Sequence, residues 1–475
     1  MKKRIISLLL MLVMCVTLVS TSQVREVQAA ETEAFVIANT WAIPDLMYGE
    51  TYGIYPVAWN EKGFIGTITQ GKLRVLLAGI RHKLLDTNCA TESGALKPVL
   101  DSSLTVKEVL NAFYLVLSNY DYTVDLGLDN KLTPVEYMKR AGIYTGTNGE
   151  QALKDICSIE QALVIATRIV TFVYDTLDAA SKGFLWEVKS GENTVYLLGS
   201  IHVASYSIYP FSDTMLKAYQ SSDALIVEAN LYDQADTTAF SQMMYYTDGT
   251  TLKDHVSAES YQKSIETAAL LGIPEETAAM LKPWALYSTF SNYTLAGNSK
   301  NDQNVIGLGI DMAFLTNAYV NQKPVYAIEG LVKQGTIFDS FSKELQEYLL
   351  NVYSDAAIDV INGTVDEETM DLNEYTDLML QYWHDGNTED CKVLLNQDDD
   401  AFDGELSKEE KVLMEEFTDK LLTKRDKGMA DNIESLLKSE GSSTYFVVVG
   451  AAHYLGDNSV IDILEDKGYV ITRVK

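Results

Sequence analysis

Thr194-Val-Tyr-Leu-Leu-Gly-Ser-Ile-His202 is matched near the far end of the chain by Tyr445-Phe-Val-Val-Val-Gly-Ala-Ala-His453. Each stretch begins with β-branched, aromatic and leucine residues, which predicts a buried strand. Each ends in Gly-x-x-His, so that a glycine allows a sharp turn and an imidazole follows the carboxyl end of the strand. Ligands and catalytic groups gather at that edge of open parallel α/β sheets. The two stretches therefore predict an α/β protein with His202 and His453 at one sheet edge.

Two further strands fit the same sheet, and each places a glutamate at its last position. These are Ala224-Leu-Ile-Val-Glu228 and Val325-Tyr-Ala-Ile-Glu329. The chain has only five histidines, so two of them in matching motifs are informative. Two histidines and two glutamates at four strand ends predict a metal site or an acid–base site.

This ordered set of motifs resembles the TraB/GumN family, which is related to the Tiki metalloproteases. The resemblance covers residues 184–475 and implies a central, mainly parallel sheet with helices on both sides, as in Tiki, TraB and erythromycin-esterase-like proteins. It also implies that the two Gly-x-x-His motifs and a glutamate form a metal-dependent protease site. The matching segments are Gly199-Ser-Ile-His202, Tyr209-Pro210, Ser222-Asp-Ala-Leu-Ile-Val-Glu228, Gly309-Ile-Asp311, Lys323-Pro-Val-Tyr-Ala-Ile-Glu329 with Gln334, Arg425 with Met429-Ala430, and Gly450-Ala-Ala-His453.

The residue types at the predicted site suit a divalent transition metal such as zinc, cobalt, manganese or iron. With His202, His453 and Glu228 as ligands, a position would remain open for a water, whose pKa the metal would lower. The second glutamate, Glu329, could then accept a proton from that water. The sequence leaves open which glutamate is the ligand and which is the base. It also leaves open a purely structural role in which one of them pairs with Arg425.

Arg425 falls on the apolar stripe of a predicted long helix, where an unpaired charge would be costly. We therefore expect it to pair with the carboxylates at the strand ends. It could orient a glutamate or stabilise an oxyanion, and the alternative is a side chain that reaches solvent past its aliphatic stem. Asp311 could either cap its own helix or reach the site. The stripe consists of Leu413, Phe417, Leu421, Met429 and Ile433.

The start of the chain has the pattern of a secretory signal peptide over residues 1–29: a basic start, a short apolar run and small residues before Ala30. An uncleaved anchor is the alternative. Removing four basic residues and one acidic residue with this segment changes the net charge from −30 to −33, which disfavours nucleic acid as a partner. Beyond it, no apolar run is long enough to span a membrane. The mature protein is therefore expected to be secreted or associated with the cell wall.

Residues 30–182 show a repeated rhythm of helix, Gly-Ile loop and helix. This rhythm resembles S-layer homology repeats, which implies binding to a cell-wall polymer. The threonine-arginine pair usual at the second helix is absent, because Thr69-Gln70 and Glu160-Gln161 stand there. The alternative is a small, mostly helical domain that packs on the enzyme. Residues 183–475 would form the α/β domain, with an acidic helical insertion at about 335–416.

The sequence contains no Gly-x-Ser-x-Gly elbow, Walker loop or His-Glu-x-x-His motif, which argues against a serine hydrolase, an NTPase and a zincin. The sequence hypothesis is an exported metal-dependent hydrolase, a peptidase that acts on an extracellular peptide or protein. The alternative is a non-catalytic, wall-associated protein that sequesters a peptide signal or a polymer.

Overall fold

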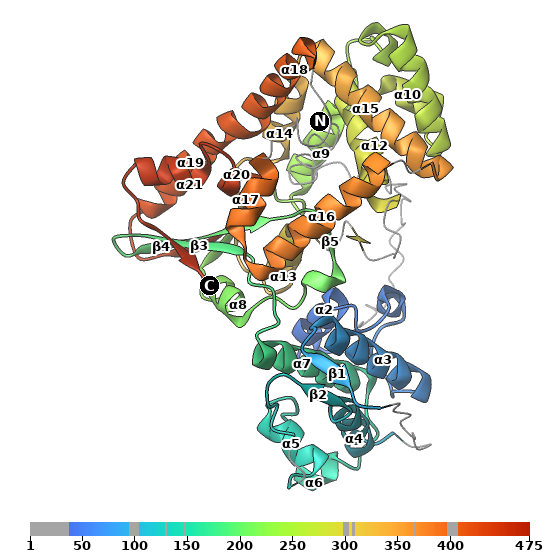
Figure 1. Ribbon diagram of the computed structural model, residues 1–475, viewed down its shortest axis with the longest axis vertical. Coiled ribbons are helices and arrows are strands. Elements are labelled where there is room, and N and C mark those ends of the chain that lie inside the picture. Colours follow the sequence, from blue (N-terminus) through green and yellow to red (C-terminus); the bar gives the residue numbers. More distant parts are fainter. Residues whose placement is uncertain are drawn as a thin grey trace. The chain divides into compact units, whose positions relative to one another are not determined.

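The computed structural model describes residues 38–94, 104–128, 131–146, 149–297, 304–305, 309–364, 367–396 and 407–475. It forms two compact units, shown with all labelled elements in Figure 1. The α/β unit contains the described parts of residues 182–205 and 214–475, and the helical unit contains the described residues up to 181 together with 206–213. The predicted signal peptide lies outside the described residues, and the predicted domain boundaries stay a prediction. Among the described helices, none has the length and apolar character needed to cross a membrane.

A six-stranded sheet forms the centre of the α/β unit, in the order β10-β3-β4-β9-β6-β8. Strands β4, β9, β6 and β8 run parallel, and β3 and β10 are added antiparallel at one edge. The predicted mainly parallel sheet is therefore confirmed. The strands are β3 (Phe184–Ser190), β4 (Asn193–Ser200), β6 (Ala224–Val227), β8 (Val325–Ala327), β9 (Thr444–Gly450) and β10 (Ile471–Val474).

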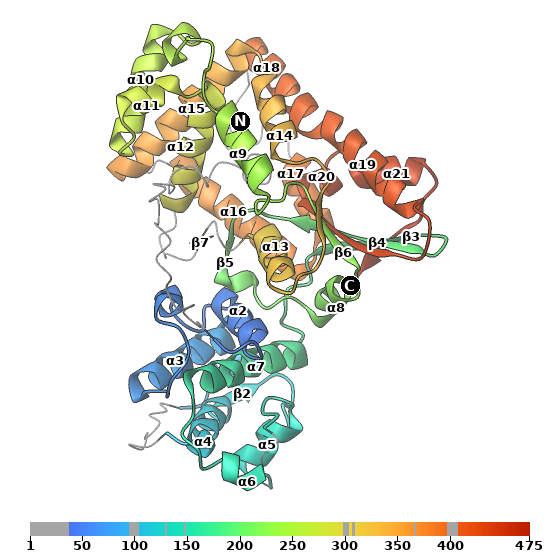
Figure 2. The same ribbon diagram turned by 180° about the vertical axis from the view of Figure 1, so that it is seen from behind.

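Helices cover both faces of this sheet, as predicted (Figures 1 and 2). The chain steps from β4 to β6 and on to β8 in one direction, and then returns to β9. Because such crossovers are right-handed, the outward steps place α8 (Asp213–Gln220) and α13 (Ile310–Val320) on one face. The return places α19 (Lys424–Leu437) on the opposite face, where it packs with α21 (Val460–Asp466).

The register of the sheet brings the two Gly-x-x-His segments side by side. Ser200 of β4 lies opposite Gly450 of β9, and the Ala451 N–H donates to the Ser200 carbonyl at 2.8 Å. Neither Gly199 nor Gly450 has a positive φ. A Cβ on Gly199 would lie 3.2 Å from the Ala451 Cα. The first glycine thus eases the close approach of the two chain segments, and its φ does not show the sharp turn expected from the sequence.

The remaining described helices of the α/β unit form a cover that includes the predicted acidic helical region. Its packing centres on α12 and α15, where Trp284, Tyr287 and Tyr353 are fully buried. Ser407 and Glu410 form a capping box at the start of one of these helices. The predicted long helix contains a π-helical turn, Asp419–Thr423. The helices are α9 (Gln234–Met243), α10 (Ala258–Leu270), α11 (Glu275–Met280), α12 (Pro283–Gly297), α14 (Leu331–Asp339), α15 (Lys343–Asn362), α16 (Glu367–Asp385), α17 (Thr388–Asn396), α18 (Lys408–Thr418) and α20 (Ala452–Leu455).

The helical unit is built around three apolar helices that begin in similar ways. Thr69, Thr105 and Ser158 each cap the helix that follows with a side-chain oxygen. Two of these caps also form isolated bridges, Ser158 with Thr67 and Thr105 with Ile156. The unit consists of α2 (Ile43–Thr51), α3 (Gln70–Asp86), α4 (Val106–Leu117), α5 (Pro134–Arg140), α6 (Gly149–Ala152), α7 (Ile159–Leu177) and the small strands β1 (Ala90–Glu92) and β2 (Tyr120–Tyr122).

The helical unit also takes in the connection Tyr206–Asp213, which follows His202 closely in the chain. The Lys83 side chain is 2% exposed, and its Nζ donates to the carbonyls of Tyr206 at 2.9 Å and Tyr209 at 2.7 Å. Burial lowers the pKa of Lys83 to about 8, although Asp86 opposes this shift. A segment that leaves the α/β unit therefore completes the core of the helical unit around a buried ammonium group.

We predict that Lys83→Ala lowers the free energy of unfolding by about 1–3 kcal/mol, because one buried and one partly buried carbonyl lose their donor. Chymotrypsin should then cleave the connection at Tyr206 or Phe211 faster than in the parent protein. Arg74→Ala, at an exposed position on the same helix, is the matched control and should change neither measurement. Equal unfolding curves and cleavage rates for both variants would show that Lys83 does not hold the connection.

Candidate functional site

The structure brings all five predicted site residues to the carboxyl edge of the parallel strands. His202 lies two residues past β4, and His453 lies in α20, the one-turn helix after β9. Glu228 directly follows β6, whereas Glu329 lies two residues beyond β8, so neither glutamate is the last strand residue that the sequence suggested. The Glu329 N–H donates to the Glu228 carbonyl at 3.1 Å, which keeps the two chain segments bonded beyond the strands. Arg425 enters from α19.

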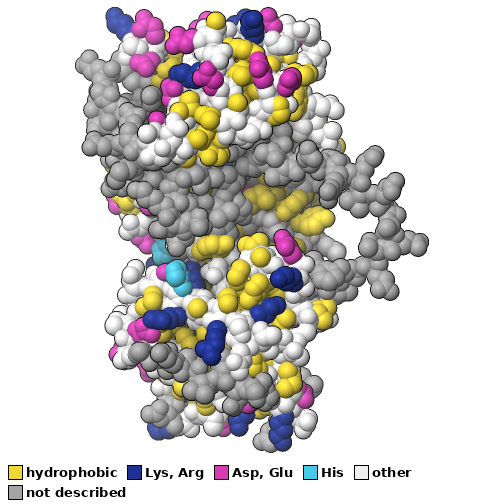
Figure 3. All heavy atoms as spheres, turned by 90° about the vertical axis from the view of Figure 1, so that its right-hand side faces the viewer, with side chains coloured by type: hydrophobic (Ala, Val, Ile, Leu, Met, Phe, Trp, Pro, Cys, Tyr) yellow, Lys and Arg dark blue, Asp and Glu magenta, His cyan; other side chains and the backbone are white. Residues whose placement is uncertain are grey.

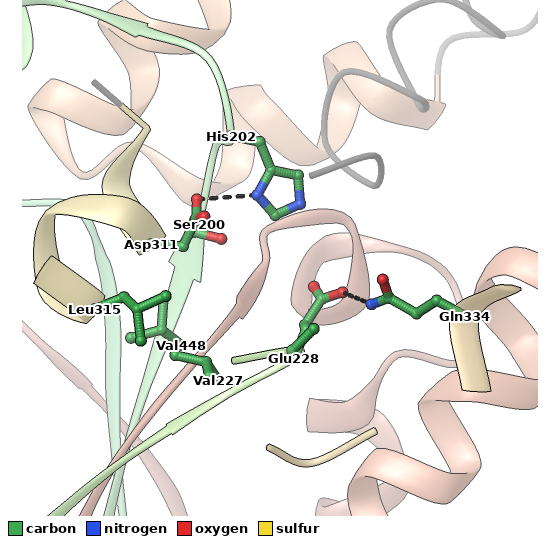
Figure 4. Close-up of a pocket in the computed structure, with 9 residues that line it drawn as sticks. Ser200, His202, Val227, Glu228, Asp311, Leu315, Gln334 and Val448 are labelled. Carbon is green, nitrogen blue, oxygen red and sulfur yellow. Dashed lines mark hydrogen bonds and ion pairs between the residues drawn. The ribbon is translucent and has the colours of Figure 1, made fainter. Parts of the chain in front are cut away.

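His202 is held by Asp311 of α13 through its Nδ1, 2.9 Å from the carboxylate Oδ1 (Figure 4). Both side chains are buried, at 4% and 5% exposure. Burial by itself lowers the pKa of His202, but the Asp311 carboxylate and Glu228 outweigh it and raise the pKa above its usual value. Asp311 makes no capping bond to its own helix, so of the two roles left open by the sequence it takes the one at the site.

His453 is held in the same way by Asp426 of α19, with 2.5 Å between Nδ1 and Oδ1. The two side chains are 0% and 3% exposed. Burial lowers the pKa of His453 well below its usual value, and the positive charge of Arg425 and the neighbouring His202 act in the same direction. The lowered pKa favours the neutral imidazole, and burial also raises the pKa of its partner Asp426 to about 8, against the opposing charge of Arg425.

The outer nitrogens of the two imidazoles have no hydrogen-bond partner in the part of the chain that the structure describes. Both His202 Nε2 and His453 Nε2 are buried, as is Oε1 of Glu329, which has an ion pair with Lys333 but no hydrogen bond. The Nε2 of His453 lies 3.9 Å from Oε1 of Glu228. Buried polar atoms without partners are rare in folded proteins, so their concentration at one edge needs an explanation.

Arg425 pairs with both predicted glutamates. Its Nη2 lies 2.6 Å from Oε2 of Glu228 and 2.7 Å from Oε2 of Glu329, and its Nε donates to Glu329 at 2.9 Å. Its Nη1 donates to the Leu421 carbonyl at 3.3 Å, and the side chain is 2% exposed. The alternative in which Arg425 reaches solvent is therefore wrong. Since all three nitrogens have partners, the geometry favours the orientation of glutamates over contact with an oxyanion.

The two glutamates differ in how completely they are bonded. Oε1 of Glu228 accepts the Gly450 N–H at 2.6 Å, and its Oε2 accepts from Gln334 at 3.2 Å as well as from Arg425. Oε1 of Glu329 has only an ion pair with the half-exposed Lys333 at 3.2 Å. Glu228 is thus fixed at both oxygens, whereas Glu329 keeps one oxygen available for a proton.

A cavity of about 10 Å³ adjoins His202 and Glu228 (Figure 4). Asp311 and Gln334 lie at its polar side, and its apolar floor includes Leu315. The volume corresponds to roughly one water molecule. The rest of the lining consists of Ser200, Val227, Ala229 and Val448.

The model of the TraB/PrgY/gumN family matches residues 184–473. The chain belongs to this family. It is 23% identical over 313 residues to Metalloprotease TIKI1 of Danio rerio, covering 61% of this chain and 62% of the relative. It is 24% identical over 320 residues to Metalloprotease TIKI2 of Xenopus tropicalis, covering 61% and 59%. It is 29% identical over 149 residues to the uncharacterized protein YbaP of Escherichia coli (strain K12), covering 30% and 51%.

The chain spans about three-fifths of the length of these Tiki relatives. No solved structure matches it. The names of the Tiki relatives imply that members of the TraB/PrgY/gumN family depend on a metal.

The donor atoms at the sheet edge are of the chemical types that bind such a metal. In metal sites, a histidine commonly bonds a carboxylate through one ring nitrogen and leaves the other for the cation, and both His202 and His453 show this arrangement. In the described part of the chain, no group of three or more His, Cys, Asp or Glu side chains is gathered closely enough to hold an ion as it stands. Glu228, which is bonded to Gly450, would have to supply the third donor.

Sequence reasoning missed Asp426 and Lys333 at this candidate site. Asp426 belongs to the run Lys424-Arg-Asp-Lys427, which has the composition of a solvated helix surface. Asp426 is nevertheless only 2% exposed. Its position next to Arg425 could have revealed it. If Arg425 lies on the buried side of the helix, Asp426 points only about 100° away and can also be buried. The other histidines, His82, His255 and His384, have partners away from the site.

We predict that Arg425→Met lowers the free energy of unfolding by about 3–5 kcal/mol, because it leaves two buried carboxylates without a counter-charge. Arg425→Lys should fall between the parent and Arg425→Met, since an ammonium keeps the charge and loses the planar fork. Lys424→Met, one position earlier at a side chain 65% exposed, is the matched control and should stay within about 0.5 kcal/mol. Denaturant unfolding measures all three, and a stable Arg425→Met variant would contradict the argument.

Proposed function

We propose that this chain is an exported metal-dependent hydrolase, and that it acts as a peptidase on a peptide or protein outside the cell. His202, His453 and Glu228 would hold one divalent cation, with zinc, cobalt, manganese and iron as the candidates. The observation that carries the proposal is the pair of buried imidazoles with bonded Nδ1 atoms and unpartnered Nε2 atoms. The names of the Tiki relatives support the same reaction class.

When bound, the cation would supply Lewis-acid chemistry for a water molecule and a scissile carbonyl. The chain's own residues divide the remaining work. Glu228 is the ligand, because Arg425 and Gly450 fix its carboxylate and its Oε1 lies near His453 Nε2. Glu329 is the base: its Oε1, which accepts no hydrogen bond, takes a proton and later returns it to the leaving amine. Lys333 lies beside that oxygen, with its Nζ 3.2 Å from Oε1.

The alternative is a non-catalytic, wall-associated protein that sequesters a peptide signal or a polymer. The observation in its favour is that one buried arginine pairs with both glutamates. Such a network would also stabilise a fold that performs no reaction. Metal binding together with hydrolysis distinguishes the two functions, because the binding protein requires neither.

We predict that the purified protein binds about one divalent transition metal ion per chain and hydrolyses peptides only when loaded. Replacing both His202 and His453 by alanine should abolish both properties, because it removes both nitrogen donors. His384→Ala, a partly exposed histidine paired with Asp385, is the matched control and should retain them. Elemental analysis and peptide cleavage before and after chelation provide the measurement. If no loading condition gives stoichiometric metal, the binding-protein alternative gains.

We also propose that the helical unit binds a cell-wall polymer, as S-layer-homology-like repeats would. The support is the repeated start of α3, α4 and α7, where a capped helix follows residues that bridge to the neighbouring repeat. The surface drawn in Figure 3 shows acidic, basic and hydrophobic side chains interspersed, so the polymer would meet a mixed surface on this side. The alternative is a domain whose role is packing alone.

We predict that the full-length protein sediments with purified cell wall that carries its secondary polymer. Wall stripped of that polymer is the control and should leave the protein in the supernatant, because the repeats would have lost their ligand. The full chain is used because residues 206–213 complete the helical unit. Equal sedimentation with both wall preparations, or with neither, would favour the packing domain.

A further inference from the structure

We propose that Asp311 and Asp426 are a matched pair of positioning residues that fix both imidazoles in the Nδ1–H form, with Nε2 left as the donor for the cation. This inference rests on the proposed metal site and adds residues that the two Gly-x-x-His motifs do not contain. Each carboxylate lies within hydrogen-bond distance of one Nδ1, at 2.9 Å for His202 and 2.5 Å for His453. All four side chains are at most 5% exposed, so water does not compete for these bonds.

The two aspartates reach the site from opposite faces of the sheet. Asp311 belongs to α13 and Asp426 to α19, and these helices cover different faces (Figures 1 and 2). The histidines themselves follow neighbouring strands, β4 and β9. Each imidazole is therefore braced from a different layer of the fold, and the relative position of the two rings depends on both layers.

The backbone near Asp311 is built to keep it beside His202. Ile310 donates its N–H to the Ile201 carbonyl at 3.1 Å. A Cβ at Gly309 would lie 2.3 Å from the His202 carbonyl oxygen, so only glycine permits this approach. Each residue of this segment thus has a physical role. Gly309 permits the close contact, Ile310 makes the backbone hydrogen bond, and Asp311 supplies the carboxylate for Nδ1.

The chain near Asp426 couples His453 to the glutamates. Arg425 pairs with Glu228 and Glu329, and the next residue, Asp426, bonds His453. Adjacent helix positions point about 100° apart, so one turn of α19 can serve both partners. Movement of this turn would therefore displace a proposed ligand, the proposed base and one histidine together.

A carboxylate that accepts a hydrogen bond from Nδ1–H keeps the ring proton on Nδ1. Nε2 then carries the lone pair and becomes a stronger metal ligand. An asparagine in its place has no charge, and its amide can turn to donate to Nδ1, which would put the ring proton on Nε2. Replacing such a carboxylate typically weakens metal affinity 10–100-fold. We expect an effect of about that size for Asp311→Asn and for Asp426→Asn, measured as the Zn²⁺ dissociation constant by chelator competition.

The matched control is Asp431→Asn, on α19 at a side chain that is 58% exposed and paired with Lys467. It makes the same chemical change on the same helix and should leave the Zn²⁺ affinity unchanged. Thermal unfolding of the metal-free proteins separates a loss of fold from a loss of positioning. Parent-like affinity in both Asp311→Asn and Asp426→Asn would overturn the inference while leaving the proposed function intact.

A second measurement needs neither a variant nor a metal. Imidazole nitrogen NMR of the ¹⁵N-histidine-labelled parent protein reports the tautomer of each of the five rings. At a pH high enough for both rings to be neutral, His202 and His453 should each carry their proton on Nδ1, and a neutral Nε2–H form at either would overturn the inference. If the tautomers are as expected and the parent protein binds no metal, it is the proposed function that fails.

Discussion

The ion pairs of Arg425 with Glu228 and Glu329 are the interaction on which the candidate site depends. Two carboxylates buried at one sheet edge would repel each other and lose their hydration, which costs several kcal/mol for each ion. The planar guanidinium offsets both effects, because it bonds Glu228 through Nη2 and Glu329 through Nη2 and Nε. It thereby joins α19 to the ends of β6 and β8. The Gly450 N–H on Glu228 adds the end of β9 to the same network.

This network also sets the electrostatics of the histidines. Arg425 lowers the pKa of His453 in addition to the larger effect of burial, and so favours the neutral ring that a metal ligand must be. Asp311 has the opposite effect on His202 and raises its pKa. The folded-state pKa of His202 lies above the unfolded value, so this group contributes stability that is present at low pH and lost as pH rises through its folded pKa. Both rings therefore bond an aspartate through Nδ1, but their pKa values are shifted in opposite directions.

The sequence was sufficient to predict the sheet, both Gly-x-x-His ends and the pairing of Arg425, because apolar strands and a charge on an apolar stripe follow simple rules. It was insufficient for Asp426, whose charged neighbours give the pattern of a solvated helix. It did not place the connection Tyr206–Asp213 in the helical unit either, because a short loop sequence does not show which core it joins. One of its partners in that unit, Lys83, lies more than a hundred residues earlier.

The four-residue spacing of the apolar stripe that contains Arg425 accounts for the π-helical turn in this helix. Apolar residues repeat at steps of four from Leu413 to Ile433. Four residues of an α-helix turn through about 400°, so each step drifts by about 40° and five such steps would leave the core. The π-helical turn Asp419–Thr423 widens the helix within this stretch and takes up part of the drift. As a result, Leu421, Arg425 and Met429 all remain buried, and the guanidinium meets the glutamates. A four-residue repeat sustained over several turns is thus itself a sequence signal for a π-turn, here one directly beside the residue that the site requires.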